Sequence, residues 1–519
     1  MTTPTANSKK IHLLTNFFTV SSWTLLSRVL GFLRDILIAA FFGSGPLAEA
    51  FQVAFAFPNM LRRFFAEGAF NMAFVPMFSK KLENIKNAQK FAQDAMAGLA
   101  SILIALTLIA QLFMPWFVFA MASGFQGDER FDITTNFARI CFPYIIFISL
   151  AALFSGVLNS MGRFAAAAAA PIVLNIILIA AMAGTWALGG NIVNALVWGV
   201  PIAGIAQLAL VWLAASRAGI RLLPQLPCLT PDIRRLALIA APAALAGGVV
   251  QINLLVGRQV ASYYDGAIQW LSMADRLYQL PLGVVGIAIG VVLLPDLSRK
   301  LKVGDTDGGR DAFNRATEFA IALTLPATVG LLVVPQAVVS VLFERGAFTS
   351  ADSQNTAAAV AIYAVGLPAF VLQKVFQPLY FARENTKTPF YFALVSMVLN
   401  AAFAIGLSAQ YGYLAAAIGT TLSSVALAIL LYWGVRRMGN ATAFDARLLR
   451  AIPRMFGAAI IMGTVTYGLS IILETWIATA GLRYIALAIL IIGGTATYFT
   501  ACLAFGAFTK QDLLNFEKR

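Results

Sequence analysis

Long apolar segments separated by short polar breaks make up almost the whole chain. Each is long enough to cross a bilayer as a helix, which takes roughly 20 apolar residues, and together they predict about 14 spans. The alternating hydrophobicity of an outer-membrane barrel strand is not seen in them. The predicted spans are residues 17–43, 47–78, 91–121, 135–159, 166–188, 192–216, 233–257, 266–297, 313–343, 355–382, 388–408, 411–435, 451–474 and 482–508.

Lysine and arginine are concentrated in every second break between these spans. Lys80, Arg299 and Arg436 belong to this basic set, whereas the breaks on the other side contain few basic residues, among them Arg130 and Arg345. Basic loops stay in the cytoplasm, so both chain ends are predicted to be cytoplasmic. That placement requires an even number of spans.

The chain also contains signs of an internal repeat. The second span ends in V-P-M-F-S-K-K-L from Val75, and the eighth ends in L-P-D-L-S-R-K-L from Leu294. A second match involves a proline and an asparagine. Pro143 of span four and Asn175 of span five are separated by the same number of residues as Pro368 of span ten and Asn400 of span eleven. Both matches imply a period of six helices. An even period keeps the two halves in the same orientation, so a pseudo-two-fold axis along the membrane normal should relate them.

We therefore predict an all-α polytopic membrane protein with two six-helix lobes and two extra C-terminal helices. The N-terminal lobe is expected over residues 1–220, the C-terminal lobe over residues 221–440 and the additional helices over residues 441–519. Two complete lobes around a central cavity would make a monomer sufficient for transport.

Composition narrows the chemistry further. Of the 519 residues, 60% are hydrophobic and 12% are charged, and the net charge of +14 comes from basic residues in loops, which argues against nucleic-acid binding. The only histidine is His12, and Cys141, Cys228 and Cys502 are too far apart for a metal site. We expect no metal or cofactor, and we interpret the three cysteines as packing residues.

Charged residues inside the predicted spans are the main functional signal, because each costs roughly 3 kcal/mol at the centre of a bilayer. The second span contains Arg62, Arg63 and Glu67, of which Arg63 and Glu67 share a helix face and are expected to pair. The first span contains Arg28, Arg34 and Asp35, and Arg28 and Asp35 share a face. Further charges are Asp275 and Arg276 in span eight and Lys374 in span ten.

The spans therefore contain six cationic and three anionic side chains. One interpretation is that they are structural struts between helices or reach the membrane interface. The other is an anion site, because the planar arginine fork donates to two phosphate oxygens and stays charged at cellular pH. Such a site would bind a diphosphate and repel an organic cation. The sequence contains no Walker loop and no catalytic constellation, so a transporter is favoured over an enzyme.

Several motifs resemble those of one family. S-R-V-L-G-F-L-R-D from Ser27, F-P-N-M-L-R-R-F-F-A-E-G-A-F from Phe57, A-D-R-L from Ala274 and A-R-E-N-T-K-T-P from Ala382 are similar to the MurJ (MviN) lipid II flippases of the MOP exporter superfamily. The resemblance covers nearly the whole chain. It implies fourteen helices in two lobes around a cationic cavity, and a groove for the undecaprenyl tail formed by the last two helices.

The resemblance also implies a function and a site. The chain is expected to move the undecaprenyl-diphosphate-linked peptidoglycan precursor, lipid II, from the inner to the outer leaflet of the bacterial cytoplasmic membrane. Arg28, Arg34, Arg62, Arg63 and Arg276 are the expected substrate-binding residues. Residues expected to pair charges or to gate are Asp35, Glu67, Asp275, Glu49 and Lys374, with Glu49 standing where relatives often have aspartate.

Two other functions stay open, and a third is disfavoured. A flippase for another polyprenyl-diphosphate-linked oligosaccharide would use the same charges, and a non-transporting membrane scaffold would use them as struts. A multidrug cation exporter conflicts with the positive cavity. Expected partners are lipid II, membrane lipids and the cell-wall synthesis machinery.

Overall fold

The computed structural model describes residues 6–62, 69–288, 299–300, 303–439 and 442–508. Every regular element within these ranges is helical, and none is a strand. The all-α fold class predicted from the apolar segments is therefore confirmed. The chain divides into two compact units, residues 1–252 and 253–519, and each is described by itself.

The first unit contains ten elements before a helix that continues into the second unit. They are α1 (Ala6–Phe42), α2 (Pro46–Arg62), α3 (Ala69–Lys81), α4 (Ile85–Leu112), α5 (Met114–Met121), the short 3-10 helix η2 (Ser123–Phe125), α6 (Glu129–Cys141), α7 (Tyr144–Ser160), α8 (Ala165–Ala187) and α9 (Ile192–Arg217). The helix α10 (Pro231–Ala261) begins in the first unit and ends in the second.

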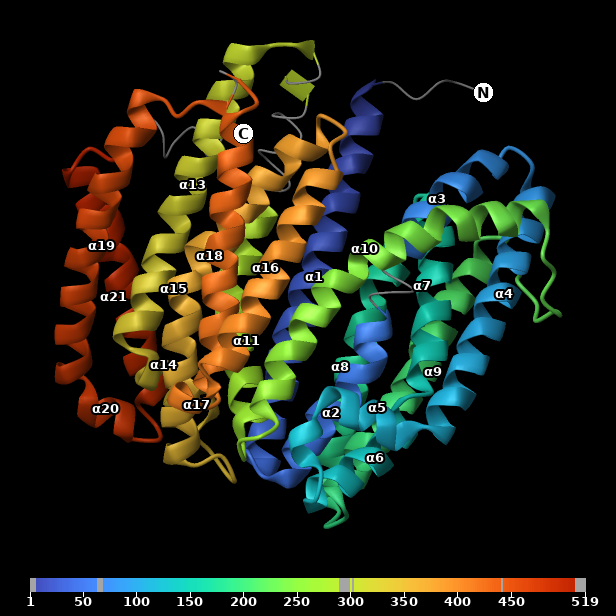
Figure 1. Cartoon of the computed structure of the whole chain (residues 1–519), viewed down its shortest axis with the longest axis horizontal. Coiled ribbons are helices and arrows are strands. Elements are labelled where there is room, and N and C mark those ends of the chain that lie inside the picture. Colours follow the sequence, from blue (N-terminus) through green and yellow to red (C-terminus); the bar gives the residue numbers. More distant parts are fainter. Residues whose placement is uncertain (1–5, 63–68, 289–298, 301–302, 440–441, 509–519) are drawn as a thin grey trace. The chain divides into compact units, whose positions relative to one another are not determined.

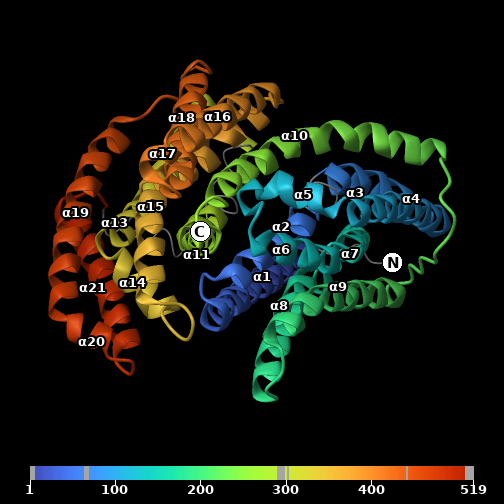
Figure 2. The ribbon, with the colours of Figure 1, turned by 60° about the horizontal axis from the view of Figure 1, so that its bottom comes forward.

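The second unit continues with another ten helices. They are α11 (Ala267–Ala288), α13 (Thr306–Val333), α14 (Pro335–Phe343), α15 (Ser350–Phe381), α16 (Lys387–Gly406), α17 (Ser408–Tyr411), α18 (Leu414–Arg436), α19 (Ala446–Ile472), α20 (Glu474–Ala478) and α21 (Arg483–Ala504). Figures 1 and 2 show α19 and α21 side by side, with α20 between them in the chain.

Ten helical stretches within the described residues are long and apolar enough to cross a membrane. They coincide with ten of the predicted spans, from the third to the sixth and from the ninth to the fourteenth. The other predicted spans fall on α1, on α2 and α3, on α10, and on α11. A multi-pass membrane protein is confirmed, while the total of fourteen stays a prediction, as do the lobe boundaries after residues 220 and 440.

The third and the ninth predicted spans are each divided into two helices with a proline at the start of the second. Residues 91–121 form α4 and α5, which meet at Phe113, and residues 313–343 form α13 and α14, which meet at Val334. Pro115 and Pro335 follow these junctions in the first turn of the new helix. Proline is tolerated there because its missing N–H would have had no helical partner, whereas it would break a continuous helix. Apolar periodicity alone does not reveal such a change of direction.

Small residues allow close helix packing in the first unit. A Cβ on Gly204 of α9 would lie 2.7 Å from the ring of Tyr144 on α7 and 3.1 Å from Phe147. Gln207, one turn later and 1% exposed, accepts a hydrogen bond from the Tyr144 hydroxyl at 2.9 Å and donates to the Ala170 carbonyl at 2.8 Å. Glycine and a buried amide thus hold α9 against α7 and α8, as in many membrane bundles.

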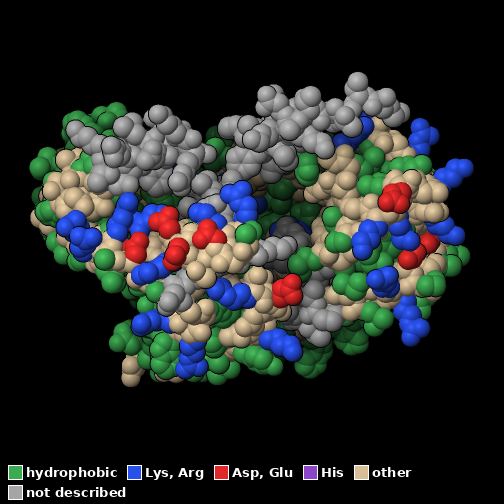
Figure 3. All heavy atoms as spheres, turned by 90° about the horizontal axis from the view of Figure 1, so that it is seen from above, with side chains coloured by type: hydrophobic (Ala, Val, Ile, Leu, Met, Phe, Trp, Pro, Cys, Tyr) green, Lys and Arg blue, Asp and Glu red, His purple; other side chains and the backbone are tan. Residues whose placement is uncertain are grey.

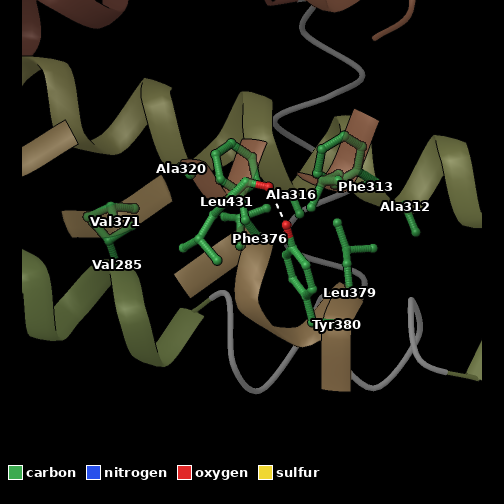
Figure 4. Packing of buried hydrophobic residues seen from close by; sticks show 12 residues of the cluster. Val285, Ala312, Phe313, Ala316, Ala320, Val371, Phe376, Leu379, Tyr380 and Leu431 are labelled. Atoms are coloured by element: carbon green, nitrogen blue, oxygen red, sulfur yellow. Dashed lines mark hydrogen bonds between the residues drawn. The ribbon is translucent and has the colours of Figure 1, made fainter. Parts of the chain in front are cut away.

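The second unit has an apolar core between α13, α15 and α18 (Figure 4). Phe313, Val375 and Leu431 are fully buried there, and the Tyr380 hydroxyl donates to the Leu431 carbonyl at 2.7 Å. A buried hydroxyl needs such a partner because no water is available to it. The bond therefore fixes α15 and α18 relative to each other.

The two asparagines of the predicted repeat make similar contacts in their own units. Asn175 of α8 donates from Nδ2 to the Ser27 carbonyl of α1 at 3.0 Å. Asn400 of α16 donates from Nδ2 to the carbonyl and side chain of Asn253 on α10, at 3.3 and 2.6 Å. The same amide therefore joins a helix to the first helix of its half in both cases. This recurrence supports the repeat, and the axis relating the halves stays a prediction.

Candidate functional site

The helix α1 places two neighbouring charges in the interior of the first unit. Arg34 is 7% exposed and Asp35 is 2% exposed. The guanidinium donates from Nε and Nη2 to one oxygen of the Asp35 carboxylate, at 3.0 and 2.7 Å. Phe55 of α2 lies beside it, with 5.9 Å between Cζ and the ring centroid. This ion pair offsets part of the cost of burying both charges.

A residue of α8 completes the environment of Arg34. Arg34 donates from Nη1 to Oδ1 of Asn175 at 3.0 Å, and Asn175 is itself 5% exposed. From the sequence, Asn175 was recognised only as part of the internal repeat. A polar amide within an otherwise apolar span was the available signal.

Arg28 lies in a different environment from Arg34 and Asp35. Its side chain is exposed, and among the described residues it makes no hydrogen bond or ion pair. The two residues thus differ in burial, and the expectation that Arg28 and Asp35 point together into an interior stays a prediction. Helical spacing places two residues on one face, but how deeply each is packed depends on the neighbouring helices.

The second helix ends at Arg62, which is half-buried. Arg63 and Glu67 lie outside the described residues, so their pairing stays a prediction.

Figure 3 shows Lys and Arg side chains at many places on the face that it views, with fewer Asp and Glu side chains among them.

Glu49 takes part in a buried charge cluster at the start of α2. It is 1% exposed, and Arg130 of α6 donates from Nη1 to its carboxylate at 2.9 Å. Arg130 also donates from Nε to Asp128 at 2.6 Å and lies 4.5 Å from the ring centroid of Phe125. From the sequence, Glu49 was expected to pair charges or to gate, and Arg130 was interpreted only as a loop residue.

Asp128 caps the first turn of α6, ahead of the apolar stretch. Its carboxylate accepts a hydrogen bond from the Arg130 backbone N–H at 3.0 Å and another from the guanidinium. Partial burial opposes ionisation, but these bonds and the positive charge hold the pKa of Asp128 below its usual value. The cluster thus keeps two carboxylates beside one guanidinium.

In the second unit the predicted charges lie on α11 and α15. Asp275 is half-buried and accepts a hydrogen bond from Gln279, while Arg276 and Lys374 are exposed. Tyr278 follows Asp275 on α11, and its ring is stacked on that of Phe370 of α15 at 5.2 Å between centroids. Aromatic packing therefore sets the position of α11 against α15.

Most of the described site residues fall into two groups, while Arg62 and Asp275 are half-buried. Arg34, Asp35 and Glu49 are buried in bonded clusters, whereas Arg28, Arg276 and Lys374 are accessible. Accessible guanidinium groups suit an anionic ligand with several oxygens, such as a phosphate. Among the described residues no group of three or more histidine, cysteine or acidic side chains could hold a metal ion.

The fold is that of a known class of membrane transporter. An inward-facing multidrug resistance MATE family transporter of the MOP superfamily matches with a TM-score of 0.67 at 13% identity, over 82% of this chain and 98% of that one. At that identity the likeness concerns the fold alone.

A narrower family is defined by sequence. The family model described as lipid II flippase MurJ matches residues 38–487. A probable lipid II flippase MurJ of Rhizobium meliloti (strain 1021) is 42% identical over 98% of this chain and 96% of its own length. One from Rhizobium tropici is 41% identical over 95% and 94%. A solved lipid II flippase MurJ in an inward closed conformation has a TM-score of 0.81 at 26% identity, over 95% of this chain and 99% of that one.

The chain belongs to the lipid II flippase MurJ family. The resemblance seen in the motifs around Ser27, Phe57, Ala274 and Ala382 is thereby confirmed.

Proposed function

We propose that this protein is a lipid II flippase, which carries the undecaprenyl-diphosphate-linked peptidoglycan precursor from the inner to the outer leaflet of the cytoplasmic membrane. The observation that carries the proposal is the family match over residues 38–487, together with relatives of similar length that bear this name. The arginines on α1 and α11 supply the chemistry that a diphosphate requires.

In this proposal the protein works by alternating access, and the diphosphate binds arginines of both lobes. Arg28 and Arg276 are accessible and make the first contacts, and Arg34, Arg62 and Arg63 complete the site. The sugar and peptide head group would occupy the water-filled cavity while the lipid tail stays in the bilayer, against the helices after residue 440. The residues expected to pair charges or gate are Asp35, Glu67, Asp275, Glu49 and Lys374.

The topology that we propose follows from the basic loops. Both termini are cytoplasmic, and the protein resides in the inner membrane as a multi-pass monomer that contacts the cell-wall synthesis machinery. A membrane potential that is negative inside acts on the net charge moved, at about 2.3 kcal/mol per charge per 100 mV. It favours outward passage of the anionic substrate.

The proposal is tested by the amount of lipid II on the outer face of cells. The protein is depleted, and an externally added enzyme that cleaves only outward-facing lipid II measures exposure, with wild type or Arg28→Ala restored. We expect exposure to collapse on depletion and to return with wild type. A normally inserted Arg28→Ala protein should restore less than about a tenth of it, because a charge-assisted contact to the diphosphate is lost.

Unchanged exposure on depletion, in a strain without a second flippase, would refute the lipid II assignment. Another polyprenyl-diphosphate-linked oligosaccharide would then become the leading cargo. Full recovery with Arg28→Ala would instead remove this arginine from the substrate site while leaving the cargo unchanged.

A further inference from the structure

Asn175 joins α8 to α1 at two points beside the predicted substrate-binding arginines. Its Oδ1 accepts from Arg34 Nη1 at 3.0 Å, and its Nδ2 donates to the carbonyl of Ser27, the residue before Arg28, at 3.0 Å. Gly31 lies between the two contacts, and a Cβ there would be 3.5 Å from Nδ2. One amide therefore contacts the guanidinium of Arg34 and the backbone next to Arg28.

The side-chain amide satisfies both contacts. Arginine has donors and no acceptor, and a carbonyl oxygen accepts but does not donate, so the side chain must present an oxygen on one side and an N–H on the other. Aspartate would lack the donor, and leucine, of similar shape, would lack both. This requirement explains a strongly polar residue at a position that is 5% exposed in an apolar helix.

The contact also leaves Arg34 able to bind an anion. A guanidinium has five N–H donors. Two are directed to Asp35 and one to Asn175. One further N–H on each of Nη1 and Nη2 can donate to phosphate oxygens, as in a bidentate arginine–phosphate pair. Asn175 and Asp35 together fix the plane in which these donors lie.

We infer that Asn175 is a positioning residue for diphosphate binding, acting through Arg34. The inference rests on the proposed function. It predicts that Asn175 does not itself contact the substrate. Removing its amide should therefore weaken binding only as long as Arg34 is present.

The test measures the dissociation constant of lipid II for the full-length purified protein. In Asn175→Leu we expect it to rise about tenfold, the effect of one lost hydrogen bond to a charged group. The matched control is Gln207→Leu, which removes an equally buried amide with two hydrogen bonds in the same unit but no contact with an arginine. It should lower the melting temperature to a similar extent and leave the dissociation constant unchanged.

A double-mutant cycle separates positioning from general loss of structure. In an Arg34→Ala background, Asn175→Leu should add little further loss of affinity, because the residue it orients is gone. If Asn175→Leu does not insert, Asn175→Asp serves instead. It keeps an acceptor for Arg34 but adds a second carboxylate beside it, so affinity should again fall about tenfold by charge neutralisation.

The outcomes are distinguishable. Absence of lipid II binding by wild type overturns the proposed function and this inference with it. If wild type binds, the inference alone is overturned by unchanged affinity in Asn175→Leu or Asn175→Asp. It is also overturned by losses that add fully to that of Arg34→Ala.

Discussion

The arginines of the first unit occupy two kinds of environment that imply different roles. Arg34 and Arg130 are buried and each contacts a carboxylate, whereas Arg28 is exposed. A buried pair contributes little net stability over an apolar pair, but removing one partner leaves an uncompensated charge. Substitution of a buried arginine therefore affects folding, and substitution of an exposed one reports more directly on binding.

The pair formed by Glu49 and Arg130 should behave as a coupled unit. Glu49→Gln removes a carboxylate from the guanidinium of Arg130, and Arg130→Met removes that guanidinium from the buried Glu49 carboxylate, so each single change should cost about 3 kcal/mol. The double variant Glu49→Gln with Arg130→Met should cost less than the two losses combined. Thermal unfolding of the purified variants measures this coupling, and strictly additive losses would contradict it.

The sequence predicted which charges lie inside the spans but not their partners. Arg34 and Asn175 are 141 residues apart, and Arg130 and Glu49 are 81 apart. Spacing along one helix identifies neighbours on its face, while contacts between helices depend on how the bundle packs.

The positions of the helices were easier to predict from the sequence than the points at which one apolar segment divides into two helices. Apolar length located ten helical stretches because a bilayer imposes that length on each span. The junctions at Phe113 and Val334 were missed, because the apolar segment continues through them while the backbone changes direction. Helix contacts, such as that of Gly204 with Tyr144, also left no periodic signal.

The contact between α9 and α7 can be tested with glycine substitutions. Gly204→Ala should lower thermal stability by about 1–3 kcal/mol, because the new Cβ would lie 2.7 Å from the Tyr144 ring and the helices must separate. Gly184→Ala on α8 is the matched control, since a Cβ there meets nothing within 4 Å. It should be neutral or slightly stabilising because alanine favours the helix. Equal melting temperatures for the two variants would argue against close packing at Gly204.

The basic loops predict how the molecule as a whole is oriented in the membrane, and its cysteines allow that orientation to be tested. Cys141 and Cys502 are buried, as expected of packing residues, but Cys228 is exposed in the connection between α9 and α10. The prediction that all three are packing residues is therefore wrong for Cys228. This connection contains Leu226 and Leu229, both more than 80% exposed, so no close-packed core surrounds the thiol. Arg217 and Arg234 flank the connection and Arg221 lies within it, so the positive-inside rule predicts that Cys228 is cytoplasmic.

A membrane-impermeant thiol reagent should therefore label Cys228 in inside-out vesicles and not in intact cells, because the reagent cannot cross the bilayer. Cys228→Ser should abolish the labelling, since the other two thiols are buried. In that background Ser350→Cys, at the exposed start of α15 beside the sparsely basic break with Arg345, should show the opposite pattern. Labelling of both positions from the same side would contradict the predicted topology, because three predicted spans, an odd number, separate Cys228 from Ser350. Labelling of Cys228 only in inside-out vesicles, and of the Ser350→Cys thiol only in intact cells, would place the basic loops on the cytoplasmic face.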